Sequence, residues 1–200
     1  MSHQFNLTRA SVDDIPEITR LEYRCFPPLV RELFMGCKTE ADIPHMSTKH
    51  SHDHVADPFD VWVKVVDNST GNIVAASNWK FFVNSGAPSA SDETPPEWLK
   101  EDARQQAAAI MRTMNDGRRK ANPGPHVHPD YQRRGLGSMI MEWGCNLADQ
   151  LFLPVWIEAS SIGGLLYRKF GFYDIGPMGG GIPGMCMRRD ARGGPQLISG

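Results

Sequence analysis

The amino-acid sequence predicts a single mixed α/β domain. Its 200 residues are 40% hydrophobic, a size and composition that suit one sizeable core. Segments with the apolar pattern of strands are interspersed with segments whose apolar residues recur every three or four positions, as they do in helices. We expect the domain to occupy residues 1–190, with an inserted loop at 84–97 and a flexible tail at 191–200.

The beginning of the chain indicates one strand followed by two helices. Phe5–Arg9 alternates between apolar and polar residues, as a half-buried strand does. Ser11 then offers an N-cap for a helix. After the break at Pro27 and Pro28, residues 30–37 continue as a second helical piece. The apolar positions of the first helix are Ile15, Ile18, Leu21 and Cys25.

A histidine-rich segment follows at residues 45–54. Imidazole binds zinc, copper and nickel, so a histidine-rich metal-binding module is one alternative function. Metal ligands need a held geometry, however, and we see no strand or helix pattern that would fix this segment. We therefore expect a solvated loop without a metal. The residues concerned are His45, His50, His52, Asp53 and His54.

The rest of the chain continues to alternate strand and helix patterns. Apolar residues three or four apart predict helices at 98–119 and 136–151. Segments rich in β-branched and aromatic residues indicate further strands. These strands are expected at 60–66, 73–82, 154–159, 173–176 and 185–188.

Charge and cysteine content exclude several classes of function. A net charge of -2 gives no electrostatic case for binding nucleic acid or an anionic membrane. No apolar run is long enough to span a bilayer. The four cysteines are scattered without a Cys-x-x-Cys, and no apolar N-terminal segment suggests secretion. We expect a cytoplasmic protein in a reducing compartment, with the nucleus as a second location.

The turn Gly135-Leu136-Gly137 opens a predicted helix and has the features of an anion-binding loop. The first turn of a helix has backbone N–H groups without partners inside the helix, and its macrodipole attracts negative charge. Glycines let a ligand approach those groups, because no Cβ stands in the way. A tight turn that only allows close packing is the alternative. The sequence has no Gly-Lys-Ser/Thr, and Ile140 replaces the third glycine of the dinucleotide fingerprint.

Two motifs in this order resemble those of the GNAT superfamily of N-acetyltransferases. Gln132-Arg133-Arg134-Gly135-Leu136-Gly137 is similar to the family's acyl-CoA pyrophosphate loop, Gln/Arg-x-x-Gly-x-Gly/Ala. Leu166–Phe172 is similar to the Leu-Tyr-x-Lys-x-Gly-Phe signature that closes GNAT domains. The resemblance is specific over 127–172 and looser over 5–82. It implies a central mixed, partly antiparallel sheet flanked by helices.

The resemblance also implies an activity. A GNAT enzyme transfers an acetyl group from acetyl-CoA, its co-substrate, to an amine on a small molecule or a protein. We expect a monomer or a homodimer with an amine acceptor and no nucleic-acid or membrane partner. The residues that the resemblance assigns to cofactor binding are Val127, Gln132, Arg133, Arg134, Gly135, Leu136, Gly137 and Ser138.

Two further residues match catalytic positions of the family. Tyr167 lies where the family has the tyrosine that protonates the departing CoA thiolate. Glu158, at the end of the strand 154–159, is the best carboxylate for accepting the proton of the amine. His126 and His128 are rivals for that role, because imidazole titrates near neutral pH.

The chain departs from the family pattern just before the pyrophosphate loop. The family has a central strand there, whose backbone pairs with the pantetheine arm and polarises the thioester carbonyl. In this chain Pro123 and Pro125 cannot donate ladder hydrogen bonds, Gly124 weakens a strand, and only Val127 is a good strand residue. We expect this strand to be shortened or missing; a mispredicted splice junction, a natural deletion and a shortened strand stabilised by its neighbours are the three alternatives. The alternative function is therefore a catalytically impaired GNAT-like protein that binds acyl-CoA weakly or not at all, because of the defect at 122–126.

Overall fold

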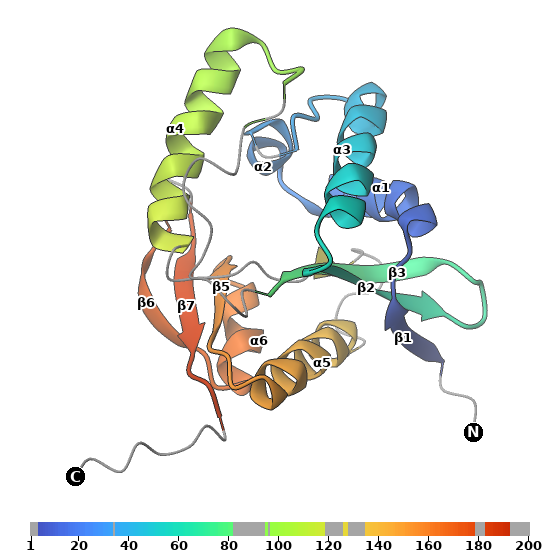
Figure 1. Cartoon of the computed structure of the whole chain (residues 1–200), viewed down its shortest axis with the longest axis vertical. Helices are drawn as coiled ribbons and strands as arrows, with labels where there is room; N and C mark the ends of the chain where they lie inside the picture. The colour runs from blue at the N-terminus through green and yellow to red at the C-terminus, as the bar shows by residue number, and fades with distance from the viewer. Residues whose placement is uncertain are drawn as a thin grey trace.

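The described strands form two antiparallel sheets with helices on either side (Figure 1). The computed structural model describes residues 4–33, 35–81, 95, 97–118, 126–127, 135–178 and 183–192. The first sheet has the order β1-β2-β3-β4 and the second has the order β5-β7-β6. Strand β4 lies at one end of the first sheet's order, and β5 lies at one end of the second sheet's order.

The first sheet is built around a long hairpin of two strands. Register pairs such as Trp62 with Asn78 and Asp60 with Lys80 join the hairpin strands, and β1 pairs with its outer side. The bounds are β1 (Phe5–Arg9), β2 (Asp60–Asp67), β3 (Ile73–Lys80) and β4 (His126–Val127). The strands predicted at 5–9, 60–66 and 73–82 are thereby confirmed to within two residues at each end.

The second sheet comes from the C-terminal part of the chain. Its central strand β7 pairs with β5 on one side and with β6 on the other. The bounds are β5 (Val155–Ala159), β6 (Tyr173–Pro177) and β7 (Met185–Arg189). These confirm the strands predicted at 154–159, 173–176 and 185–188.

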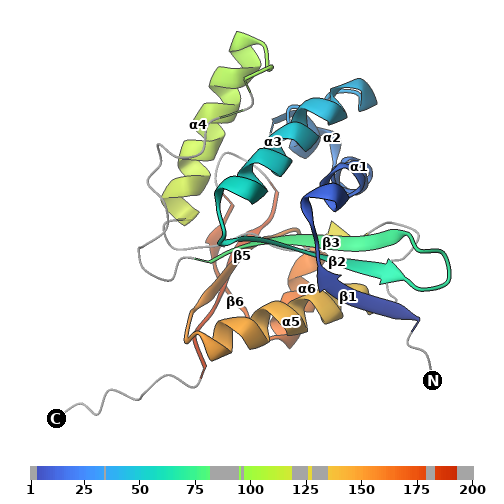
Figure 2. The ribbon, with the colours of Figure 1, turned by 45° about the vertical axis from the view of Figure 1, so that its right-hand side comes forward.

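Helices cover both faces of the first sheet. Figures 1 and 2 show α1 to α4 on one side of the strands and α5 with α6 on the other. The bounds on the first side are α1 (Ile15–Cys25), α2 (Pro28–Leu33), α3 (Ile43–Ala56) and α4 (Glu101–Arg118). Those on the second side are α5 (Leu136–Gln150) and α6 (Gly163–Lys169). None of the described helices is both long and apolar enough to cross a membrane.

The hairpin strands place alternate side chains in two separate cores. Val63 and Val65 of β2 pack with α5 and the second sheet, in the largest cluster of buried side chains. Trp62, the residue before Val63, packs on the opposite face with Ile15 and Ile18 of α1. This alternation follows from the two-residue period of a strand. The first sheet is therefore a buried layer between the α1 side and the α5 side.

The histidine-rich segment is a helix, so the predicted solvated loop is wrong. Residues 45–54 lie within α3. Pro44 is the second residue of this helix, and its fixed φ suits the first turn of a helix. The Asp42 carboxylate accepts hydrogen bonds from the backbone of Thr39 at 2.8 Å and of Lys38 at 3.0 Å, directly before the helix. Packing of α3 against α1 supplies the stability that the weakly amphipathic segment lacks by itself.

Two other predictions differ in detail from the structure. The second helical piece, expected at 30–37, is α2 at Pro28–Leu33, because Pro28 is tolerated in the first turn of a helix. The sheet expected as one central layer consists, in the described residues, of two hydrogen-bonded sheets. The helix expected at 98–119 is confirmed as α4, which begins at Glu101.

Candidate active site

The start of α5 is the clearest candidate for an anion-binding site. Gly135 precedes the helix with a left-handed φ of 85°, which costs an L residue roughly 1–2 kcal/mol. A Cβ at this position would meet no atom within 4 Å, so backbone conformation and not crowding demands glycine. The N–H groups of Leu136, Gly137 and Ser138 belong to the first turn and have no partner within the helix. These donors and the positive end of the helix dipole therefore lie together at a glycine turn.

The side chains at this helix start differ in their surroundings. Leu136 is buried in the main core with 1% of its surface exposed, so only its backbone N–H is available to a ligand. Gly137 and Ser138 are half-buried. The predicted ligands Gln132, Arg133 and Arg134 lie outside the described residues, and their roles stay predictions.

Tyr167 lies in α6, on the α5 side of the second sheet. Its side chain is buried, and its ring is tilted against Phe172 with 6.0 Å between centroids. Burial raises the pKa of the phenol, so the hydroxyl keeps its proton at any physiological pH. Within the described part of the chain, the structure shows no hydrogen-bond partner for this hydroxyl. Tyr167 has the properties of a proton donor that is held in a low-dielectric setting.

Glu158 lies on the other face of the second sheet. Its neighbours Ile157 and Ala159 belong to the core cluster that contains Tyr167, and strand alternation turns Glu158 away from that cluster. Glu158 is half-buried and pairs in register with Cys186 of β7. The structure thus places the two predicted catalytic residues on opposite faces of β5.

Val127 is one of two described residues of β4. It pairs with Ala75 of β3, and His126 pairs with Ala76, whose side chain packs in the cluster under α1. The strand therefore occupies the end of the first sheet, next in order to β3. His128 lies outside the described residues.

A buried acid and a histidine join α1 to α3 on the side opposite α5. The Glu22 Oε2 atom lies 3.3 Å from Nδ1 of His50, and Oγ1 of Thr19 lies 3.4 Å from the same nitrogen. The His50 ring packs against Trp62 of β2 with 5.1 Å between centroids. Burial raises the pKa of Glu22 to about 8.

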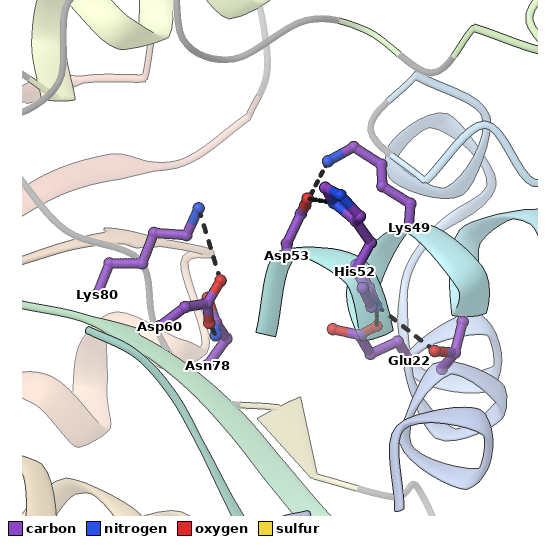
Figure 3. Close-up of polar contacts among 9 residues, drawn as sticks. Glu22, Lys49, His52, Asp53, Asp60, Asn78 and Lys80 are labelled. Atoms are coloured by element: carbon purple, nitrogen blue, oxygen red, sulfur yellow. Dashed lines mark hydrogen bonds and ion pairs between the residues drawn. The ribbon is translucent and has the colours of Figure 1, made fainter. Parts of the chain in front are cut away.

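A second polar group lies where α3 passes over the ends of β2 and β3 (Figure 3). Asp60 is buried and accepts a hydrogen bond from Asn78, and its Oδ2 is 3.8 Å from Nζ of Lys80. Burial raises the pKa of Asp60. On α3, Asp53 forms an ion pair with Lys49 at 2.5 Å. Within the described ranges, no three His, Cys, Asp or Glu side chains gather in a geometry that could hold a metal ion.

Sequence comparisons match only short parts of the chain. No protein-family model matches it. A probable acyltransferase, SID5, of Ajellomyces capsulatus is 34% identical over 41 residues, which cover 20% of this chain and 30% of that protein. An acetyltransferase of Stachybotrys chartarum is 38% identical over 52 residues, which cover 26% of this chain and 23% of that protein. The chain therefore spans less than a third of the length of the curated relatives that it matches.

Solved structures match nearly the whole chain. Mosquito arylalkylamine N-acetyltransferase like 5b superposes with a TM-score of 0.63 at 13% identity, over 93% of this chain and 99% of that one. The structure of histone acetyltransferase HPA2 and related acetyltransferase from Corynebacterium glutamicum gives 0.60 at 14% identity, over 94% and 97%. PaiA N-acetyltransferase from Thermoplasma acidophilum, solved in complex with coenzyme A, gives 0.55 at 10% identity, over 95% and 99%. The chain has the GNAT fold.

The GNAT fold identifies β4 as the strand for which the sequence predicts a defect. A strand is present at this place, and its two described residues are both paired with β3. Residues 119–125 and 128–134 lie outside the described residues, so a shortened strand stays a prediction.

The buried acid on α1 of this GNAT fold is absent from the sequence-based predictions. Glu22 lies four residues after Ile18 and three before Cys25, so it falls on the apolar stripe of the helix. A carboxylate on the apolar stripe of a helix can be recognised from the sequence, and it indicates a buried acid. Its partner His50 could not be paired with it, because the segment 45–54 was predicted to be a solvated loop.

Proposed function

We propose that this GNAT-fold chain transfers an acetyl group from acetyl-CoA to an amine. The start of α5 carries the proposal, since a left-handed glycine opens a 15-residue helix whose first N–H groups are available to an anion. The CoA pyrophosphate is such an anion. The acetyltransferase names of the structural neighbours and curated relatives support the same reaction.

The proposed cofactor site extends from the helix into the preceding loop. The N–H groups from Gly135 to Ser138 hold the pyrophosphate, and Gln132, Arg133 and Arg134 compensate its charge and that of the adenosine 3′-phosphate. Val127 contributes backbone groups of β4 to the pantetheine arm. We place the thioester beside β4, the end strand of the first sheet, with α5 on one face of that sheet and α1 on the other.

This arrangement separates the proton donor from the proton acceptor. Tyr167, on the α5 side, protonates the departing thiolate. An unperturbed phenol of pKa ~10 is already a weaker acid than a thiol of pKa ~8.5, and burial raises the pKa of Tyr167 further, so the transfer requires a thiolate that is poorly solvated. The acceptor amine approaches from the other face, where Glu158 is the proton acceptor predicted from the sequence. A base is needed because an alkylamine of pKa ~10.4 is neutral in only about one of a few thousand molecules at pH 7.

Titration of the purified protein with acetyl-CoA tests the cofactor site. We expect saturable binding in calorimetry and a higher melting temperature, because a ligand that binds only the folded state stabilises it. Gly135→Asp should abolish binding by placing a carboxylate against the phosphates. Gly71→Asp is a matched control, since Gly71 also has a left-handed φ, of 76°, and open space around its Cβ, but lies in the β2–β3 link. Equal binding by the two variants would contradict the site.

A screen of amine acceptors then tests the reaction. Free CoA and an acetylated amine must appear together when wild-type protein receives acetyl-CoA and a suitable amine. Acetyl-CoA binding without turnover of any small-molecule, peptide or protein amine would refute the proposed transfer while leaving the cofactor site intact.

A further inference from the structure

Glu22 is an acid in the centre of an apolar helix face. Its residue is 6% exposed, and the neighbouring positions of the face, Ile15, Ile18 and Thr19, are completely buried. Burial of a carboxylate in such surroundings favours its neutral form. A structure that needed only packing would place an apolar residue here, so the carboxyl group requires a separate explanation.

The surroundings of Glu22 hold its carboxylate in place. Nδ1 of His50 lies at 3.3 Å, an ion-pair distance, from the carboxylate, and the His50 side chain is 14% exposed. Thr19, one turn earlier in α1, has its Oγ1 atom 3.4 Å from the same His50 nitrogen. The Thr19 hydroxyl donates a hydrogen bond to the Ile15 carbonyl at 2.8 Å. The indole of Trp62, on β2, packs against the His50 ring.

Two thiols of the described residues, whose pKa the charge of Glu22 affects, do not compete for its proton. Burial raises the pKa of the Cys25 thiol to about 12 and that of Cys37 to about 11, and the charge of Glu22 adds to each shift. Both thiols therefore stay neutral near pH 7. Further along α3, Lys49 and Asp53 neutralise each other in their ion pair.

The pair lies on the face of the first sheet from which the amine approaches. Helix α1 packs against β3 and β4 as well as against α3. Strand β4 is the end strand beside which the thioester is held, and α1 covers the face opposite α5. The acid therefore lies on a helix that packs against β4, on the acceptor side of the proposed reaction centre.

We infer that Glu22 accepts the proton of the acceptor amine and that His50 positions its carboxylate. The inference rests on the proposed acetyl transfer and names the base for that same site. It assigns to Glu22 the role that the sequence suggested for Glu158.

The proton and electron balance of this step is complete. The ammonium form of the acceptor gives one proton to the Glu22 carboxylate, and the neutral amine attacks the thioester carbon. The new C–N bond forms, the C–S bond breaks, and the nitrogen's second surplus proton ends on the CoA thiolate. Glu22 then returns its proton to water, so each turnover releases one proton.

A purely structural role makes a different prediction for the same variant. If Glu22 only pins α1 to α3 as a neutral acid, Gln has the same shape, no charge and similar hydrogen-bonding groups, and Glu22→Gln should behave like wild type. If Glu22 is the base, the variant cannot take a proton. We expect unchanged acetyl-CoA affinity and a loss of about 10²–10⁴-fold in kcat/KM for an alkylamine.

The experiment compares Glu22→Gln with Glu32→Gln, which makes the same change at an exposed position of α2. Turnover is measured with an alkylamine and with an aromatic amine, whose own nitrogen is neutral at pH 7. For the wild type and Glu32→Gln, kcat/KM with the aromatic amine should rise with pH through about 8 as Glu22 ionises. The rise should vanish in Glu22→Gln. Equal rates and equal pH profiles for the two variants would overturn the inference.

Additional measurements distinguish failure of the Glu22 assignment from failure of the proposed acetyl transfer. If Glu22→Gln does not melt cooperatively, the wild type alone decides. A wild-type kcat/KM for the aromatic amine that does not change between about pH 7 and 9 overturns the inference. A wild type that binds acetyl-CoA but acetylates no amine refutes the proposed function, and the base with it. Loss of the pH-dependent rise in Glu158→Gln but not in Glu22→Gln assigns the base to Glu158.

His50→Phe tests the positioning role. Phenylalanine keeps a ring against Trp62 but cannot form the ion pair that a protonated His50 makes with the carboxylate, and loss of that positive charge disfavours the ionised acid. The inflection of kcat/KM should move to higher pH while acetyl-CoA affinity is unchanged. An unmoved inflection would remove His50 from the mechanism.

Discussion

Gly144 of α5 lies directly against the indole ring of Trp79 on β3. A Cβ at Gly144 would stand 2.1 Å from Cζ2 of Trp79, far inside van der Waals contact. The indole has little room to move, because it is 3% exposed and its centroid lies 6.5 Å from that of Phe81 and 6.1 Å from that of Trp143. The missing side chain at Gly144 therefore sets how closely α5, with its candidate anion site, approaches the first sheet.

Gly144→Ala should destabilise the protein although alanine is the better helix former. Overpacking a filled core costs about 1–3 kcal/mol, and the gain in helix propensity is roughly 1 kcal/mol. We expect a lower midpoint in urea unfolding. Asn146→Ala, at an exposed position of the same helix, is the control that measures the propensity gain alone. If Gly144→Ala is as stable as this control, the Trp79 indole can shift to make room for the added methyl group.

The ion pair between Arg189 and Asp149 should contribute more stability than an exposed pair of similar geometry. Arg189 has 3% side-chain exposure and bonds both carboxylate oxygens of Asp149, at 2.7 and 2.6 Å. Asp149→Asn leaves a buried guanidinium without its counter-charge, for which we expect a loss of about 3 kcal/mol. Asp174→Asn breaks the pair with Arg168, whose side chains are 48% and 37% exposed, and should cost less than about 1 kcal/mol. Equal losses in urea unfolding would contradict this difference in burial.

The fold could be predicted from the sequence where the signal is local. The strand pattern of Asp60–Asp67 and the glycine turn before Leu136 depend on neighbouring residues only, and both lie where the sequence indicates. Gly135 adopts a left-handed φ, a conformation that glycine tolerates better than other residues. Such features need no knowledge of what packs against them.

The acid–histidine pair could not be predicted because its parts are distant in sequence and weak in pattern. Thr19 and His50 are 31 positions apart, and α3 owes its helical state to packing on α1. Helix propensity and periodicity are weak guides for such a segment, since tertiary contacts decide its conformation. Counting only apolar residues on α1 also left Glu22 out of the buried stripe.

Stability should fall as pH rises through the range in which Glu22 ionises. Its pKa is raised from 4.5 to about 8 in the folded protein, so the folded state binds more protons than the unfolded state between these values. The contribution is fully present below about pH 4.5 and is lost by about pH 8, at no more than about 1.4 kcal/mol per pH unit. Glu22→Gln should flatten this part of the stability profile, measured by urea unfolding at several pH values. The same slope in the variant and in wild type would show that another group is responsible.

Tyr167→Phe should separate chemistry from binding and from folding. The hydroxyl has no hydrogen-bond partner among the described residues and the ring is buried, so its removal should change the free energy of unfolding by less than about 1 kcal/mol. The ring contact with Phe172 remains, and acetyl-CoA affinity should stay nearly intact because the start of α5 is untouched. If the phenol protonates the thiolate, kcat should fall by about 10²-fold or more. Calorimetry and steady-state rates measure the two effects separately, and an unaffected kcat would remove Tyr167 from the reaction and leave it as a residue of the core.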